Sequence, residues 1–138
     1  MAFGAKRIFP IDTTPGTAVG VSIPFNAPSV FNSSYTTKDA TKNNLINYFL
    51  TNIGDRYDNP TFGGNLREYV FEQIQQNTFD NIEDDIQQKI ATYFPTVAVS
   101  SINISKIGDQ TDYNTIVVEI NYNIVGTGQT DTLQIAFT

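Results

Sequence analysis

Carboxylate pairs are the residues of this sequence best placed for acid–base chemistry. Glu68 and Glu72 stand four positions apart, which would place them on one face of a helix, and Asp55 and Asp58 share a short polar segment. A glycoside hydrolase could use two such groups, one as the acid and one as the base or nucleophile. No pattern around them indicates a perturbed environment, so solvated or ion-paired surface carboxylates are the favoured interpretation.

A loose cation site is the second chemical candidate. Asp109, Asp112 and Asn114 lie close together, but they lack the glycine and the distal glutamate of a calcium loop, which favours a plain turn. The sequence contains no His and no Cys, which excludes Ser-His-Asp catalysis, thiol nucleophiles, disulfides and nearly every zinc, copper or haem site. No phosphate-binding loop or dinucleotide fingerprint is present. We therefore expect no cofactor, no metal and no enzymatic activity.

Composition narrows the class of partner. The chain has 138 residues, enough for one domain, and 40% of them are hydrophobic. Only 16% are charged, so the surface must be largely neutral and polar, which suits a protein packed against others. The net charge of -6 and the lack of a basic cluster predict no binding to nucleic acid. No segment reaches the ~20 apolar residues of a membrane span and no signal peptide is recognisable, so we expect a chain that stays in the cytoplasm or enters a particle assembled there.

The N-terminal part is predicted to be an extended arm over residues 1–36. Four of the six prolines fall there, a density expected to forbid a helix. One short strand is compatible with the pattern of residues 19–25. Residues 37–138 are predicted to form a single α+β domain.

Three helices are predicted at the start of this domain, over residues 38–52, 65–75 and 79–93. Thr36 or Thr37 can cap the first helix, and Pro95 ends the third. Apolar residues at helical spacing define the inner faces. They are Leu45, Ile46, Phe49 and Leu50 in the first helix, Leu66, Tyr69, Val70 and Ile74 in the second, and Phe79, Ile82, Ile86, Ile90 and Tyr93 or Phe94 in the third.

The last third is predicted to be an antiparallel β-meander, with strands over residues 97–107, 115–125 and 130–137. A change of apolar parity at Ser100-Ser101 predicts a β-bulge in the first strand. Strict alternation in the other two strands predicts one buried face, which includes Ile116, Val118, Ile120, Leu133, Ile135 and Phe137. The resulting fold class is α+β, with helices on one face of a small antiparallel sheet that ends in a C-terminal β-hairpin.

Two features could bind another protein. Arg56 lies in a loop where it could contact a partner's carboxylates or carbonyls, or pair more simply with a carboxylate of its own chain (Asp55, Asp58 or Glu68). Phe62 could anchor this loop to the core. The last strand would offer unpaired backbone groups if it lay at the sheet edge, unless it pairs centrally or the arm covers it. The loop residues, in order, are Gly54, Asp55, Arg56, Pro60, Phe62, Gly63 and Leu66.

This ordered set, followed by Phe71-Glu72, resembles the signature of the small baseplate wedge subunits of contractile-tailed phages. These are the sheath initiators of the lysozyme-like GPW family, with relatives in type VI secretion baseplates and contractile bacteriocins. The family pattern is Gly-Glu-Arg, then Pro-x-Phe-Gly, then a Leu and a Phe-Glu on the next helix, and the layout of elements also agrees. Asp55 departs from it, because the family usually has Glu there, which keeps the charge but shortens the reach.

The resemblance implies a structural protein of the virion, assembled in the host cytoplasm. Its implied place is the tail-tube end of each baseplate wedge, with the wedge core proteins and the tail sheath protein as partners. The implied wedge-docking residues are Asp55, Arg56, Pro60, Phe62 and Gly63. The implied template for sheath strands comprises the strands that carry Ile116, Val118, Ile120, Leu133, Ile135 and Phe137. Two alternatives stay open, a cell-wall hydrolase carried by the baseplate and an adaptor unrelated to phages.

Overall fold

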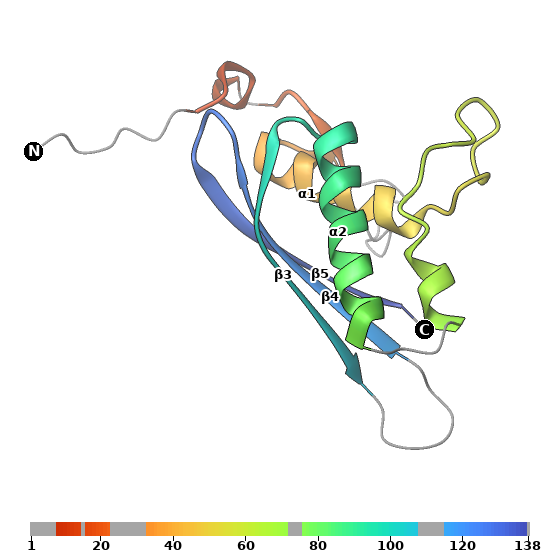
Figure 1. Ribbon diagram of the computed structural model, residues 1–138. Helices are drawn as coiled ribbons and strands as arrows, with labels where there is room; N and C mark the ends of the chain where they lie inside the picture. Colours follow the sequence, from red (N-terminus) through yellow and green to blue (C-terminus); the bar gives the residue numbers. More distant parts are fainter. Residues whose placement is uncertain (1–7, 15, 23–32, 72–75, 108–114, 138) are drawn as a thin grey trace, which may run out of the picture.

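The computed structural model describes residues 8–14, 16–22, 33–71, 76–107 and 115–137. Within them, two α-helices and a three-stranded antiparallel sheet form an α+β fold, as predicted (Figure 1). None of the helices in these ranges is long and apolar enough to cross a membrane. The elements in order are η1 (Pro10–Thr13), β1 (Gly20–Val21), β2 (Ser33–Ser34), α1 (Thr37–Leu50), η2 (Leu66–Phe71), α2 (Gln76–Tyr93), β3 (Val97–Ile107), β4 (Thr115–Ile124) and β5 (Gln129–Phe137).

Helix α1 begins at Thr37, one residue before the predicted start, and Thr36 is the one of the two predicted caps that is used. The Thr36 hydroxyl accepts a hydrogen bond from the Asp39 amide, so one of the free N–H groups of the first turn is satisfied. The buried face differs from the predicted stripe, because Tyr48 is fully buried and Leu50 is 49% exposed. Position 48 lies three residues after the buried Leu45 and shares its face, whereas position 50 is turned away from that face.

The prediction of a second α-helix over residues 65–75 is wrong for the residues that are described. Residues 66–71 form the 3₁₀-helix η2, and residues 72–75 lie outside the described ranges. Asn65 has a left-handed φ of 52°, and its carbonyl accepts from the Glu68 amide three residues on, the spacing of a 3₁₀ turn. The prediction of about three helices therefore fails here, while the third predicted helix is present as α2 and begins at Gln76.

The sheet confirms the predicted meander. The strand order is β3-β4-β5, and the register shifts between Val99 and Ser101, where the bulge was predicted. The inner face of the sheet and both α-helices share one hydrophobic core, and Figure 1 shows α2 lying along the sheet. The largest fully buried side chains of that core are Tyr48, Tyr122, Phe49, Leu45, Ile82, Ile86, Ile90, Ile120, Ile124, Leu133 and Val118.

The predicted extended arm is partly folded where it is described. A 3₁₀-helix begins at Pro10, a position where proline is tolerated because the first N–H groups of a helix have no partner within it, so the expectation that the prolines forbid any helix is wrong. The Asp12 carboxylate accepts hydrogen bonds from the Thr37 amide (2.8 Å) and hydroxyl (2.7 Å), which ties this segment to α1. Of the predicted strand, Gly20–Val21 is formed and pairs with β2. The division of the chain at residue 36 stays a prediction.

The burial of Tyr48 predicts how the stability of the chain depends on pH. Its buried hydroxyl has no hydrogen-bond partner among the described residues, and burial, then the charges of Tyr93 and Asp85, raises its pKa from 10.0 to about 12. Because burial penalises the charged phenolate, the free energy of unfolding does not depend on this group below pH 10 and falls as the pH rises from 10 to 12, by about 1.4 kcal/mol per pH unit. We expect Tyr48→Phe to leave stability at pH 8 unchanged or higher.

Urea unfolding of both proteins at pH 8 and pH 11 measures this effect. The wild type should lose more stability than Tyr48→Phe between the two pH values. Burial also raises the pKa of Tyr122, so the variant should still lose some stability. Equal losses in the two proteins would show that Tyr48 does not contribute to the pH dependence.

Candidate functional site: a loop and a sheet edge

The loop that carries the sequence signature, residues 54–64, projects away from the sheet (Figure 1). Its base is closed by a hydrogen bond of 2.7 Å from the Gly54 amide to the Pro60 carbonyl. The Asp55 carboxylate accepts from the Asn52 amide at 2.9 Å, so this predicted docking residue also shapes the start of the loop. We call residues 54–64 the 54–64 loop.

The end of the 54–64 loop lies directly on the last turn of α1. Gly63 has a φ of 141°, and a Cβ at this position would lie 2.6 Å from the Thr51 carbonyl oxygen. The Gly64 amide donates to the Tyr48 carbonyl at 2.9 Å, and a Cβ there would lie 2.6 Å from the Phe49 ring. The two glycines therefore let the loop backbone approach the helix more closely than other residues would allow.

Gly63→Ala should destabilise the chain by more than the ~1–3 kcal/mol expected of a strained φ alone, because the added methyl group meets backbone. Gly54→Ala is the matched control, since Gly54 also has a positive φ (93°) but nothing within 4 Å of an added Cβ. Urea unfolding of both variants measures the difference. Equal losses of stability would mean that the close approach at Gly63 is not what requires glycine.

An aromatic cluster anchors the 54–64 loop. The Phe62 ring packs at right angles on Tyr48, with centroids 4.9 Å apart, and edge-on against Tyr93 at 6.1 Å. The prediction that Phe62 anchors the loop to the core agrees with these contacts. Phe62 in turn supports Arg56, whose guanidinium carbon lies 3.9 Å from the ring centroid.

Arg56 is presented to the outside by this stacking. Its side chain is exposed, and among the described residues it forms no ion pair with Asp55, Asp58 or Glu68, the partners that the simpler interpretation predicts. The guanidinium is planar and carries its five N–H groups at its rim. Stacking on Phe62 therefore leaves the donors available to a partner's carboxylate or carbonyl groups.

Three exposed apolar side chains within or just before the 54–64 loop were not predicted from the sequence. Leu50 is 49% exposed, Ile53 52% and Tyr57 100%. Leu50 and Ile53 lie at or just beyond the end of α1, and Tyr57 follows Arg56 in the chain. Leu50 was assigned to the core on its helical spacing, and nothing in the sequence distinguishes a solvent-facing Tyr57 from a buried one.

Two of the four carboxylates considered for catalysis bind neighbouring groups of their own chain. Asp55 binds the Asn52 amide, and the Glu68 carboxylate accepts from the Asn65 side chain. Glu72 and the possible cation loop at residues 109–114 lie outside the described residues. Within the described ranges, no group of three or more acidic side chains is arranged to hold a metal ion.

The second candidate site is an edge of the sheet. Strand β4 pairs with β3 on one side and β5 on the other, so it has no free edge to offer. Among the residues that the structure describes, strand β5 pairs with β4 alone and without a register shift, and it carries the exposed side chains Thr132, Gln134 and Ala136 on its outer face. The side chains named for the template lie in the core, namely Ile116, Val118, Ile120, Leu133, Ile135 and Phe137. Only the backbone of β5 can therefore serve as the predicted template.

Solved structures show that this fold occurs in baseplate and tail proteins. A protein of Geobacter sulfurreducens named provisionally as a tail lysozyme matches with a TM-score of 0.62 at 18% identity, over 74% of this chain and 90% of its own. The anti-feeding prophage baseplate matches with a TM-score of 0.53 at 16% identity, over 83% of this chain and 78% of that chain. At these identities the likeness shows the fold alone.

The sequence itself gives the family. The chain belongs to the family described as baseplate wedge protein gp25, whose model matches residues 36–129. The baseplate wedge protein gp25 of Enterobacteria phage T4 is 31% identical over 84 residues, which are 61% of this chain and 61% of that protein. The residues matched by the family model include the whole 54–64 loop and strands β3 and β4, and they end at Gln129, the first residue of β5. The resemblance stated from the loop signature is thereby confirmed.

Proposed function

We propose that this chain is a baseplate wedge subunit of a contractile tail with two binding sites. The 54–64 loop docks on the wedge core proteins, and the backbone edge of β5 starts polymerisation of the tail sheath. Family membership supports the place in the baseplate. The sheath role is supported by the sheet edge at β5, a regular strand that is paired on one side only within the described part of the chain.

The 54–64 loop has the properties of a docking surface. Arg56 offers planar hydrogen-bond donors, and the fully exposed Tyr57, the next residue in the chain, offers apolar area. Arginine and aromatic residues dominate the binding energy of many protein interfaces. The contacts of Phe62 with the core hold this surface in one shape, which lowers the entropy lost on binding.

The edge of β5 suits strand addition. An incoming strand gains main-chain hydrogen bonds from an edge, and its side-chain alternation fixes the register. Six copies in a ring would present six such edges, from which a helical sheath could grow. The partners are then the wedge core proteins and the sheath protein, with the tail tube adjacent, in a virion assembled in the host cytoplasm.

We do not propose the hydrolase alternative. The carboxylates of Asp55 and Glu68 each hold a neighbouring amide, which is the behaviour of structural groups. The structural neighbour named as a tail lysozyme is 18% identical, which supports a common fold and not a common activity.

The proposal is tested by capture. The tagged full-length chain is incubated separately with the candidate wedge core proteins and the sheath protein encoded in the same genome. We expect both to be retained by folded chain. Retention of neither would contradict the proposal and would make a cell-wall hydrolysis assay the next step.

A further inference from the structure

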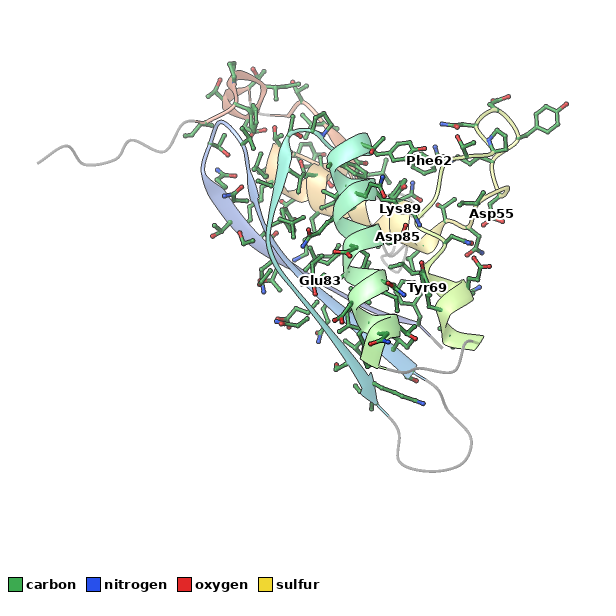
Figure 2. The ribbon with its side chains drawn as sticks, viewed as in Figure 1. Asp55, Phe62, Tyr69, Glu83, Asp85 and Lys89 are labelled. Atoms are coloured by element: carbon green, nitrogen blue, oxygen red, sulfur yellow. The ribbon has the colours of Figure 1, made fainter. Side chains whose placement is uncertain are left out.

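A charged cluster lies next to the end of the 54–64 loop and has no part in the contacts proposed with the wedge core or the sheath. Lys89 and Asp85 stand one turn apart on α2, and Tyr69 comes from η2. Figure 2 shows them on the side of α2 that faces the loop and η2. Lys89 is only 19% exposed and Asp85 28%, so this is a partly buried ion pair and not a solvated one.

The Lys89 ammonium bridges two acceptors. It donates to the Asp85 carboxylate at 2.6 Å and to the Gly64 carbonyl at 2.7 Å. The Tyr69 hydroxyl donates to the same Asp85 oxygen at 3.4 Å, which helps to hold the carboxylate in place. Hydrogen bonds from an ammonium group are stronger and shorter than those between neutral groups.

Gly64 is thereby held by both helices. Its amide binds the Tyr48 carbonyl on α1, and its carbonyl binds Lys89 on α2. Gly64 is the last residue of the loop, two positions after Phe62, which supports Arg56. Holding Gly64 at both its amide and its carbonyl fixes where the loop ends, two residues from the Phe62 ring on which Arg56 stacks.

We propose that Lys89 is a positioning residue of the 54–64 loop, acting through the Gly64 carbonyl and not by touching the partner. The inference rests on the proposed function for what the loop binds. An isolated ion pair of this kind adds little net stability, because desolvation offsets its attraction, but it restricts geometry. Replacing Lys89 takes the ammonium away from Asp85 and from the Gly64 carbonyl, and because Gly64 belongs to the loop, we expect the loop end to loosen more than strand β4.

Amide hydrogen exchange of the full-length chain tests the positioning role. In Lys89→Met, which keeps most of the aliphatic stem, the amides of residues 62–65 should exchange at least about tenfold faster, equivalent to ~1.4 kcal/mol, while those of β4 keep their wild-type rates. Lys106→Met, at an exposed lysine of β3, is the matched control and should change neither set. Lys89→Arg keeps a cation and should stay within threefold of wild type.

Wild-type exchange of residues 62–65 in Lys89→Met would overturn the proposal. An equal acceleration in β4 would also overturn it, because that is the signature of a general packing role. If Lys89→Met does not fold, Asp85→Asn removes the charge that holds the ammonium. It should accelerate the loop amides at least threefold, and no acceleration would overturn the proposal in the same way.

Capture of the wedge core separates this inference from the proposed function. If Arg56→Ala and Lys89→Met both weaken capture, the latter by about tenfold, the two are supported together. If only Arg56→Ala weakens it, docking stands and the role of Lys89 in docking is overturned. If neither does, the proposed docking role fails, and the exchange rates alone decide whether Lys89 positions the loop.

Discussion

Arg56→Ala is expected to weaken docking on the wedge core strongly while the chain stays folded. The guanidinium is exposed and forms no ion pair within the described residues, and its stacking on Phe62 contributes only about 0.5–1 kcal/mol. Removing one partner of a hydrogen-bonded charge pair at an interface costs about 2–5 kcal/mol, since the other group is left unpaired. Affinity for the wedge core should therefore fall about thirtyfold or more, as measured by titration calorimetry.

Two further variants test whether the loss of binding is due to the guanidinium group of Arg56. Lys106→Ala removes an exposed cation from β3 and should bind as the wild type does, which controls for net charge. Arg56→Lys keeps the charge without the planar donor set and should bind with intermediate affinity. Binding of Arg56→Ala within threefold of wild type would show that the 54–64 loop does not dock through this residue.

Lysines on the outer face of β5 are expected to stop sheath initiation. Gln134 and Ala136 are exposed on this strand, so Gln134→Lys with Ala136→Lys should leave the core intact. Charged side chains, lysine above all, are the means by which natural edge strands resist pairing with another chain. Sheath capture should fall at least about tenfold, with wedge capture unchanged.

The sheet provides a matched control at its other edge. Asn103 and Ser105 of β3 lie across β4 in the same rows as Gln134 and Ala136, through Glu119 and Val117. Asn103→Lys with Ser105→Lys adds the same charge to the same face and should retain the sheath protein. Equal losses in the two double variants would contradict a template confined to β5.

Deletion of the last strand would be a poorer experiment. Leu133, Ile135 and Phe137 are buried in the core, so a chain without β5 loses three core side chains along with the edge. Truncating a single buried side chain of this size to alanine already costs about 2–5 kcal/mol. Loss of sheath capture by such a chain would not distinguish a missing template from a lost fold.

The β part of the fold could be predicted from sequence because its signal is local. Alternation of period two placed β3 at its observed bounds and β4 and β5 within one residue, and the parity change located the bulge at Val99/Ser101. The cap at Thr36 placed the start of α1. In each case the residues that determine the structure are neighbours in the chain.

The conformation of residues 66–71, the folded part of the arm and part of the site depend on contacts between residues that are distant in the sequence. Residues 66–71 have a helical apolar pattern but form a 3₁₀-helix, next to a left-handed Asn65 and two glycines packed on α1. The bond from Asp12 to Thr37 spans 25 positions, so the pattern of the arm gives no sign of it. For the site, the loop residues were found from their order, whereas the Lys89 contact with Gly64 and the strand that forms the edge required the structure.

Hydrogen exchange of this chain with and without the sheath protein tests directly whether the sheath protein adds a strand to the edge of β5. An added strand should protect the amides of residues 129–137 that β4 leaves unpaired, because they gain main-chain partners. We expect new protection to be concentrated in β5, with β3 and the 54–64 loop exchanging as before. Sheath binding that instead protects β3, or that leaves β5 unprotected, would contradict it.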